Sequence, residues 1–133
     1  MSTYFHGTAA IFESFSTDSR GSLTSFPGSD LATFFAASRA DADFYAAKSA
    51  EWHAGQDLPC DRRIITASID LSGALVADED VIEIDGEEIS IDDDRAILRA
   101  ARAAGFTAVH FPLGNANNAG ETVAVIDLSI VSI

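Results

Sequence analysis

The chain has 133 residues and a formal net charge of −13, with 21 acidic and eight basic side chains. This length predicts one domain over residues 1–133, large enough to bury a core without cross-links. Eight cations among so many acids cannot easily line a surface that tracks phosphates, so we expect no binding to duplex nucleic acid.

The hydrophobic residues make up 47% of the chain, but no run of eighteen apolar residues occurs. We therefore expect no membrane span. The first residues lack a basic stretch followed by an apolar one, which predicts a cytoplasmic location, although delivery as an effector stays open. The single cysteine, Cys60, is typical of a reducing compartment and predicts an ordinary thiol.

The N-terminal third is expected to form strands separated by a long loop. Thr3–Gly7 predicts a short strand that ends at a glycine, and Ile11–Phe15 a second short strand or a turn. Residues 16–30 are rich in Ser, Thr, Gly and Asp, which predicts a loop of a length that is often functional. Leu31–Ala36 is the next expected strand.

A helix is expected over residues 39–52, with Ser38 as its N-cap. Ala40, Phe44, Ala47 and Lys48 fall on one face, which predicts that this mixed face packs inward. Gly55 and Pro59 then mark the end of the helix.

Residues 63–71 predict a strand, and the acidic segment 78–94 follows with ten of the 21 acids and no Lys or Arg. Within it, 81–84 and 87–91 are expected to form a hairpin around Asp85-Gly86. The acids fall mainly on alternate positions, which favours a solvated β-ribbon over a metal or partner site. Their spacing is not that of a calcium loop, so we expect no metal.

A second helix is expected to begin at a cap on Asp92 or Asp93, to run to Ala104 and to stop at Gly105. Ile97, Leu98 and Ala101 would share its inner side. Three more strands are expected over residues 106–111, 122–127 and 130–133, with a loop over 112–120. The elements add up to the α+β class.

Five segments together carry a family resemblance: Tyr4–Thr8, Thr33–Ala36, Asp41–Ala46, Ala104–Val109 and Glu121–Ile133. They resemble the ADP-ribosyltransferase superfamily in its diphtheria-toxin and poly(ADP-ribose) polymerase branch. The chain looks most similar to the small ADP-ribosyltransferase domains of bacterial and phage polyvalent proteins. The resemblance implies a fold of two packed, mainly antiparallel sheets with about two helices, and NAD as the substrate.

His6-Gly7-Thr8 matches the motif with which this branch holds NAD. A ring N–H of His6 would bond a ribose hydroxyl, and Gly7 would let its backbone approach the nicotinamide amide. The resemblance also implies that Phe34 and Tyr45, eleven positions apart, clamp the nicotinamide ring by stacking. Arg20, in the long loop, is a candidate for the NAD pyrophosphate.

Two positions depart from the family pattern or leave its register open. Ala42 stands where the family often has a serine near the amide. The family's acid, which would stabilise the ribosyl cation that forms as the glycosidic bond breaks, corresponds to Glu121. Counting back from Asp127 would instead put Thr122 at that position, and a slip of one residue changes the face of a strand.

These matches predict a mono-ADP-ribosyltransferase that cleaves the nicotinamide–ribose bond of NAD and passes ADP-ribose to a protein acceptor, with water as a side reaction. Glu121 and His6 would be its catalytic residues. One alternative is a non-catalytic NAD-binding or protein-interaction module, and a weaker one is an acidic nucleic-acid mimic. His53 and His110 have no matched partners and are predicted to be structural or surface residues. The oligomeric state stays open.

Overall fold

We analysed a computed structural model, which describes residues 2–8, 31–55, 63–114 and 120–132. The described strands are β1 (Ser2–Thr8), β2 (Thr33–Ala36), β3 (Arg63–Ile69), β4 (Ala74–Val76), β5 (Val81–Ile84), β6 (Glu87–Ser90), β7 (Ala108–Phe111), β8 (Thr122–Val125) and β9 (Val131–Ser132). The helices are α1 (Arg39–Gly55), α2 (Asp94–Ala104) and the 3-10 turn η2 (Leu128–Ile130). The α+β class and the two α-helices are confirmed.

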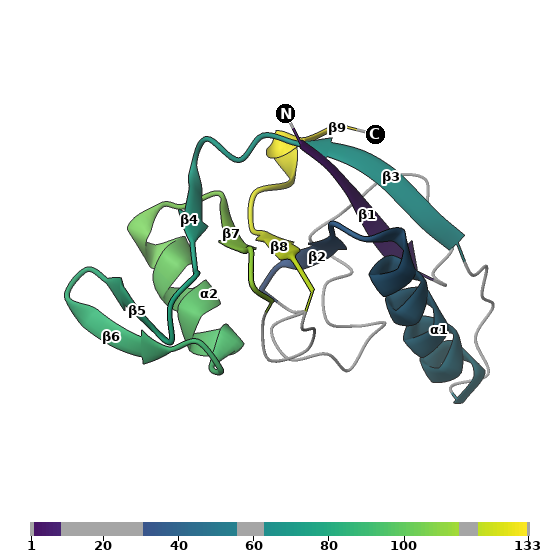
Figure 1. Ribbon diagram of the computed structural model, residues 1–133, viewed down its shortest axis with the longest axis horizontal. Coiled ribbons are helices and arrows are strands. Elements are labelled where there is room, and N and C mark those ends of the chain that lie inside the picture. Colours follow the sequence, from purple (N-terminus) through teal and green to yellow (C-terminus); the bar gives the residue numbers. More distant parts are fainter. Residues whose placement is uncertain (1, 9–30, 56–62, 115–119, 133) are drawn as a thin grey trace.

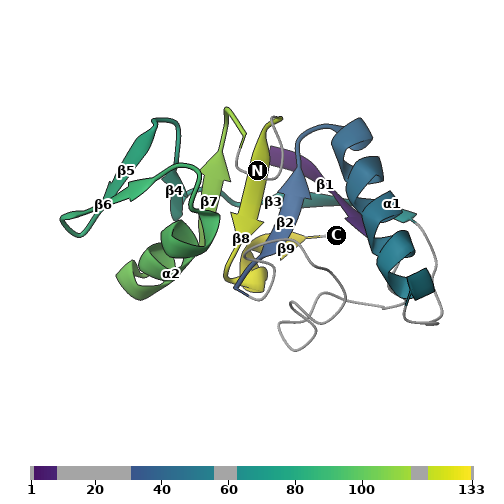
Figure 2. The ribbon, with the colours of Figure 1, turned by 90° about the horizontal axis from the view of Figure 1, so that it is seen from below.

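The main sheet has seven strands in the order β4-β7-β8-β2-β1-β3-β9, and β5 with β6 forms a separate hairpin. All its pairings are antiparallel except that of β4 with β7. The sheet curls, so that β1 and β3 run across the line of β2 and β8 (Figures 1 and 2). The structure therefore shows one continuous curled sheet and a small ribbon, where two packed sheets were expected.

The helices lie over different parts of the sheet: α1 packs mainly against β1, and α2 lies near β5, β6 and β7 (Figure 1). On α2, Ile97, Leu98 and Ala101 are fully buried, as their spacing predicted. Burying side chains such as Ile97 and Leu98 stabilises the fold by roughly 1.5–3 kcal/mol each. The helix begins at Asp93, whose carboxylate accepts from the Ala96 N–H, and ends at Gly105 with a φ of 89°.

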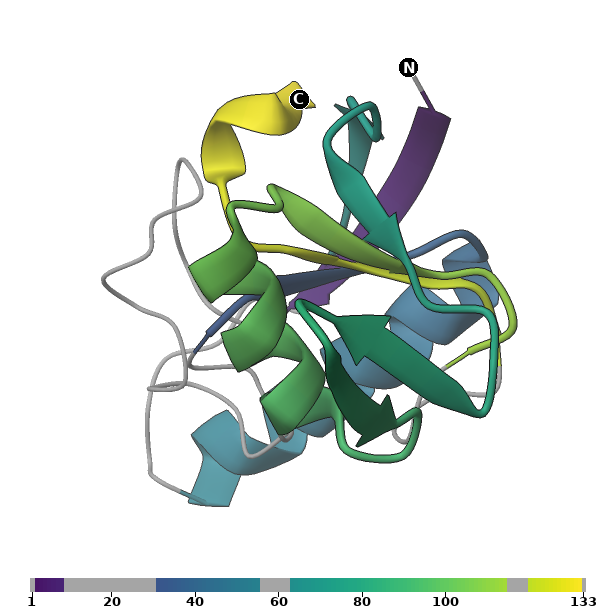
Figure 3. The ribbon, with the colours of Figure 1, turned by 90° about the vertical axis from the view of Figure 1, so that its left-hand side faces the viewer.

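The acidic hairpin lies beside α2 (Figure 3), and its isoleucines belong to the same apolar cluster as the buried apolar residues of α2. Ile82, Ile84 and Ile89 are buried, and the acids between them are exposed. Asp85 and Gly86 have φ values of 50° and 82°, the left-handed pair that a two-residue hairpin turn requires. The hairpin, its turn and its solvated acids are confirmed.

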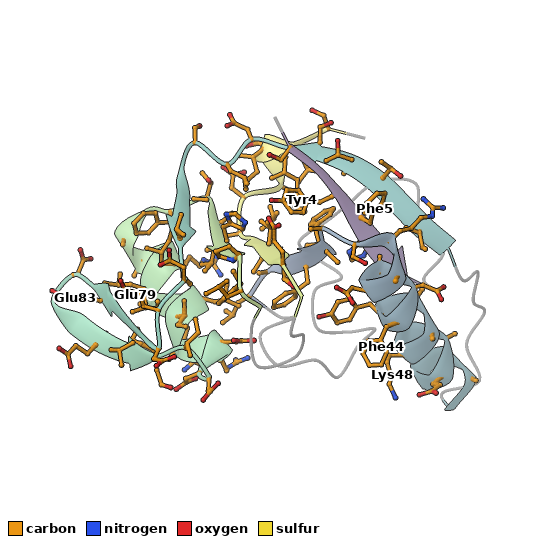
Figure 4. All side chains as sticks on the ribbon, viewed as in Figure 1. Tyr4, Phe5, Phe44, Lys48, Glu79 and Glu83 are labelled. Carbon is orange, nitrogen blue, oxygen red and sulfur yellow. The ribbon has the colours of Figure 1, made fainter. Side chains whose placement is uncertain are left out.

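The inward face of α1 differs from the prediction. The structure buries Ala42, Tyr45 and Ala46, whereas Phe44 and Lys48 are exposed and lie against each other on the outer side (Figure 4). A close approach to β1 decides the face. A Cβ on Gly7 would lie 1.6 Å from the carbonyl oxygen of Ala42, so only a glycine lets the two backbones meet.

Several predicted bounds shift by a few residues. β2 begins two residues later than expected, β3 and β8 end two earlier, and η2 with β9 replaces a single terminal strand. The edge strand β4 was not predicted, because its three residues carry no alternating pattern. The predictions for Ile11–Phe15, for residues 16–30 and for Cys60 concern positions outside the described residues.

Candidate functional site

The two faces of the main sheet differ in character. The helix-covered face carries Phe34, Val109, Phe111 and Ala124, which pack with the apolar residues of α2 and the hairpin. We call the other face the Glu121 face. It carries Tyr4, Phe35, Val123 and Val125, covered by residues from η2 and β9. Alternation along β1 places Tyr4 and His6 on the Glu121 face and Phe5 opposite, as the two labelled side chains show (Figure 4).

Strand register brings Tyr4 into line with Glu121. Phe5 pairs with Ala36 and Ala36 with Thr122, so the residues one step away, Tyr4 and Glu121, lie in the next row. Ala37 lies between them, and its N–H donates to the Glu121 carbonyl at 3.0 Å. Two strand spacings amount to about 10 Å. The small side chain of Ala37 leaves room for the tyrosine to reach across.

Glu121 is the centre of a three-residue cluster. The Tyr4 hydroxyl donates to Glu121 Oε2 at 2.8 Å, and His110 Nε2 lies 2.7 Å from the same oxygen. An ionised carboxylate only accepts hydrogen bonds, so Nε2 of His110 carries the proton in this contact. The rings of Tyr4 and His110 also meet edge to face, with centroids 6.4 Å apart.

Tyr4 is the buried part of the cluster, and the Glu121 side chain is its most exposed part. Tyr4 is 4% exposed, the His110 side chain 19% and the Glu121 side chain 37%. The hydrogen bonds from His110 and Tyr4 lower the pKa of Glu121. Burial, followed by the contact with Glu121, raises the pKa of Tyr4, so the tyrosine stays a neutral donor. Glu121 is therefore an ionised, oriented and partly exposed acid.

Glu121 and Thr122 lie on opposite faces of the main sheet. Thr122 is fully buried, and its hydroxyl donates to the Gly120 carbonyl at 3.1 Å. Glu121, one residue earlier, shares the sheet face of His6. Of the two residues, only Glu121 presents a carboxylate on the face that carries the histidine of the first motif.

His6 lies on the same sheet face as this cluster, two residues after Tyr4 on β1. Its Nδ1 lies 2.7 Å from the Phe34 carbonyl oxygen, and its ring stands 5.3 Å from the ring of Phe35. A carbonyl only accepts, so Nδ1 carries a proton. Burial lowers the pKa of His6, which favours the neutral ring with Nε2 as an acceptor.

The ladder between β1 and β2 is short beside His6. The two strands pair only at Phe5 and Ala36, whereas β1 pairs with β3 along all seven residues. In a continued ladder, the backbone of β1 would pair with β2 at this point. Instead, the His6 ring bonds the Phe34 carbonyl. The ladder between β1 and β2 thus stops short of Gly7, where the backbone of α1 packs against β1. The Thr8 backbone ends β1, and Arg20 lies outside the described residues.

The two residues expected to clamp nicotinamide belong to the helix-covered side. Phe34 packs against the apolar cluster of that face, and Tyr45 is buried on α1, close to Ala42 and Ala46 at Gly7. The structure therefore places Tyr45 near Gly7 but Phe34 on the sheet face opposite to His6 and Glu121. The clamp stays a prediction.

Sequence reasoning missed Tyr4 and His110. The expectation that His110 has no partner is wrong, because its ring bonds Glu121. The available signal was alternation: Tyr4 lies two residues before His6, and His110 interrupts the otherwise apolar β7. The contacts themselves depend on register across four strands, β1, β2, β8 and β7, which the sequence does not display.

Comparisons with protein-family models, with curated proteins and with solved structures gave no significant match. Neither helix in the described parts of the chain combines the length and apolar character needed to cross a membrane. Across residues 2–8, 31–55, 63–114 and 120–132, no three His, Cys, Asp or Glu side chains gather as metal ligands would.

Proposed function

We propose that this protein binds NAD and breaks its nicotinamide–ribose bond as an ADP-ribosyltransferase, with Glu121 as the acid at the ribose. The observation that carries the proposal is the Glu121 carboxylate. It is held by Tyr4 and His110, is partly exposed, and shares a sheet face with His6. Cleavage of the glycosidic bond builds positive charge on the ribose, and a fixed carboxylate beside it stabilises that charge.

The stretch of β1 after Phe5, where its pairing with β2 ends, is the place that we propose for nicotinamide. Gly7 lies there, and Tyr45 lies on the helix that packs against it. In this proposal the Gly7 backbone meets the amide, Tyr45 offers a ring face and His6 Nε2 accepts from a ribose hydroxyl. Thr8 and Arg20 complete the binding residues that the resemblance implies, whereas Phe34 lies on the opposite sheet face. The ADP-ribose then passes to a protein acceptor or to water.

The test is NAD consumption and nicotinamide release by the purified chain. Glu121→Gln keeps the shape of the side chain but removes its charge, so turnover should fall at least about 100-fold. Glu83→Gln, an exposed acid on β5 far along the chain from the cluster, is the matched control and should keep full turnover. Equal turnover in the wild type and Glu121→Gln would refute the catalytic role.

The acceptor requires a separate measurement. Lysate proteins incubated with labelled NAD and the enzyme should gain the mass of ADP-ribose, and the gain should disappear with Glu121→Gln. Nicotinamide release without labelled protein would identify water as the acceptor and reduce the proposal to NAD hydrolysis.

A non-catalytic module is the second candidate, and the packing at Gly7 favours it. The close approach of α1 to Gly7 explains the glycine without any ligand. Calorimetry with NAD and with a non-hydrolysable analogue separates the two candidates. Similar heats for both ligands, with no nicotinamide released, would support binding without catalysis.

A further inference from the structure

We infer that His110 and Tyr4 are positioning residues that act together on Glu121, fixing its Oε2 so that Oε1 is presented to a ligand hydroxyl. The inference rests on the proposed function for the identity of that hydroxyl, a ribose 2′-OH. The arrangement of the carboxylate itself depends only on the contacts in this chain.

Both positioning bonds fall on one oxygen. Tyr4 and His110 reach Oε2 at 2.8 and 2.7 Å, and no described residue hydrogen-bonds to Oε1. The donors come from two different strands: Tyr4 from β1, and His110 from β7 next to β8. Two rigid rings that approach from separate strands restrict the torsions of a glutamate, which is otherwise a flexible side chain.

The two oxygens of the Glu121 carboxylate have different roles, and this difference has a chemical consequence. A carboxylate that stabilises a ribosyl cation must stay ionised and point one oxygen at the sugar. Donors on Oε2 favour the ionised form, and Oε1 keeps its lone pairs for the substrate hydroxyl. His6, on the same sheet face, bonds the Phe34 carbonyl and does not take part in holding Oε2.

Two properties separate positioning from general stability. A positioning role predicts that kcat falls while KM for NAD changes little, because the acid contributes mainly in the transition state. It also predicts rescue by a residue that restores the donor. Glutamine can place an amide N–H near the position of histidine Nε2, whereas alanine cannot.

The first measurement compares His110→Ala, His110→Gln and Tyr4→Phe with the wild type in NAD turnover. We expect kcat to fall about tenfold to 100-fold in His110→Ala, in the range produced by small misplacements of a reacting group. His110→Gln should recover most of that loss. Unchanged kcat in both His110→Ala and Tyr4→Phe, with turnover still dependent on Glu121, would overturn the inference.

The second measurement does not depend on NAD chemistry. Carboxyl titrations followed by NMR report the protonation midpoint of Glu121 in the folded protein. The midpoint should rise toward that of an ordinary glutamate in His110→Ala and in Tyr4→Phe. Asp70, whose carboxylate accepts from the Ser72 N–H, serves as the internal control and should not move.

The two measurements keep failure of the inference distinct from failure of the proposed function. If the wild type turns over no NAD but the Glu121 midpoint rises in both variants, the proposed function fails and the positioning holds. If the Glu121 midpoint is unchanged in both variants, while circular dichroism shows them folded, the inference fails. Should His110→Ala not fold, His110→Gln and Tyr4→Phe decide the question by the same two readouts.

Discussion

Gly7→Ala tests whether the contact between α1 and β1 explains the glycine of the first motif. The added Cβ would lie 1.6 Å from the Ala42 carbonyl oxygen and 2.8 Å from the Ala46 nitrogen. Both atoms are backbone, so no side-chain rotation relieves the overlap. To reach an ordinary contact near 3.4 Å, the helix would have to move by about 1.8 Å.

Such a displacement loosens the packing of Ala42, Tyr45 and Ala46, all of which are buried. Overpacking a tight core usually costs about 1–3 kcal/mol. Because the overlap here involves two backbones, we expect a loss near or above 3 kcal/mol in the free energy of unfolding. For a chain of this length, that corresponds to roughly 10 °C in Tm.

Urea unfolding followed by circular dichroism measures this loss, provided that the slope m stays constant. Gly55→Ala is the matched control, because a Cβ there meets no heavy atom within 4 Å. It should be neutral or stabilising by up to about 1 kcal/mol, as expected for alanine in a helix. A Gly7→Ala protein as stable as the wild type would refute the packing argument. If such a protein had also lost NAD binding, the glycine would serve the ligand alone.

Three further predictions concern the capped helix, the acidic hairpin and His6. Asp93→Ala should lower the free energy of unfolding by about 1 kcal/mol by removing the N-cap of α2, whereas Asp92→Ala should change it by less than about 0.5 kcal/mol in the same urea titration. Glu88→Lys should raise stability by about 0.2–1 kcal/mol, because Glu88 lies directly opposite Glu83; a gain that persisted undiminished in 1 M salt would contradict this electrostatic origin. Burial lowers the pKa of His6 below its ordinary 6.5, so the contribution of the neutral ring to the free energy of unfolding is complete above pH 6.5 and is lost as the pH falls through the folded-state pKa. The free energy of unfolding of the wild type should therefore fall more steeply below pH 6.5 than that of His6→Gln. Parallel stability profiles for the two proteins would rule the effect out.

Local chemistry in the sequence determined the elements whose signals lie within a few residues. Asp93 and Gly105 bound α2 because a cap and a left-handed stop act within one helical turn. The Asp85-Gly86 turn and the alternating acids specified the hairpin in the same way. The three-four spacing of apolar residues identified the buried side of α2, where apolar and charged positions contrast strongly.

Where apolar and charged positions contrasted only weakly, tertiary packing determined which face of the element is buried. Apolar and charged side chains are weakly segregated around α1, so its sequence alone does not distinguish an inner face. Gly7 determines which face of α1 is buried, because the helix backbone can approach β1 closely only where β1 has no side chain. The parallel pairing of β4 with β7 likewise depends on how the chain between them crosses over, and a strand of three residues carries no sequence pattern that predicts it.

The candidate site shows the same division. The sequence alone supplied His6, Gly7 and Glu121 as residues of the right chemistry, and left open which of Glu121 and Thr122 would share a face with the histidine. Only the tertiary structure placed Glu121 beside Tyr4, 117 positions away, and beside His110. Register between strands sets those neighbours, and register arises from the pairing of the whole sheet rather than from any short stretch of the chain.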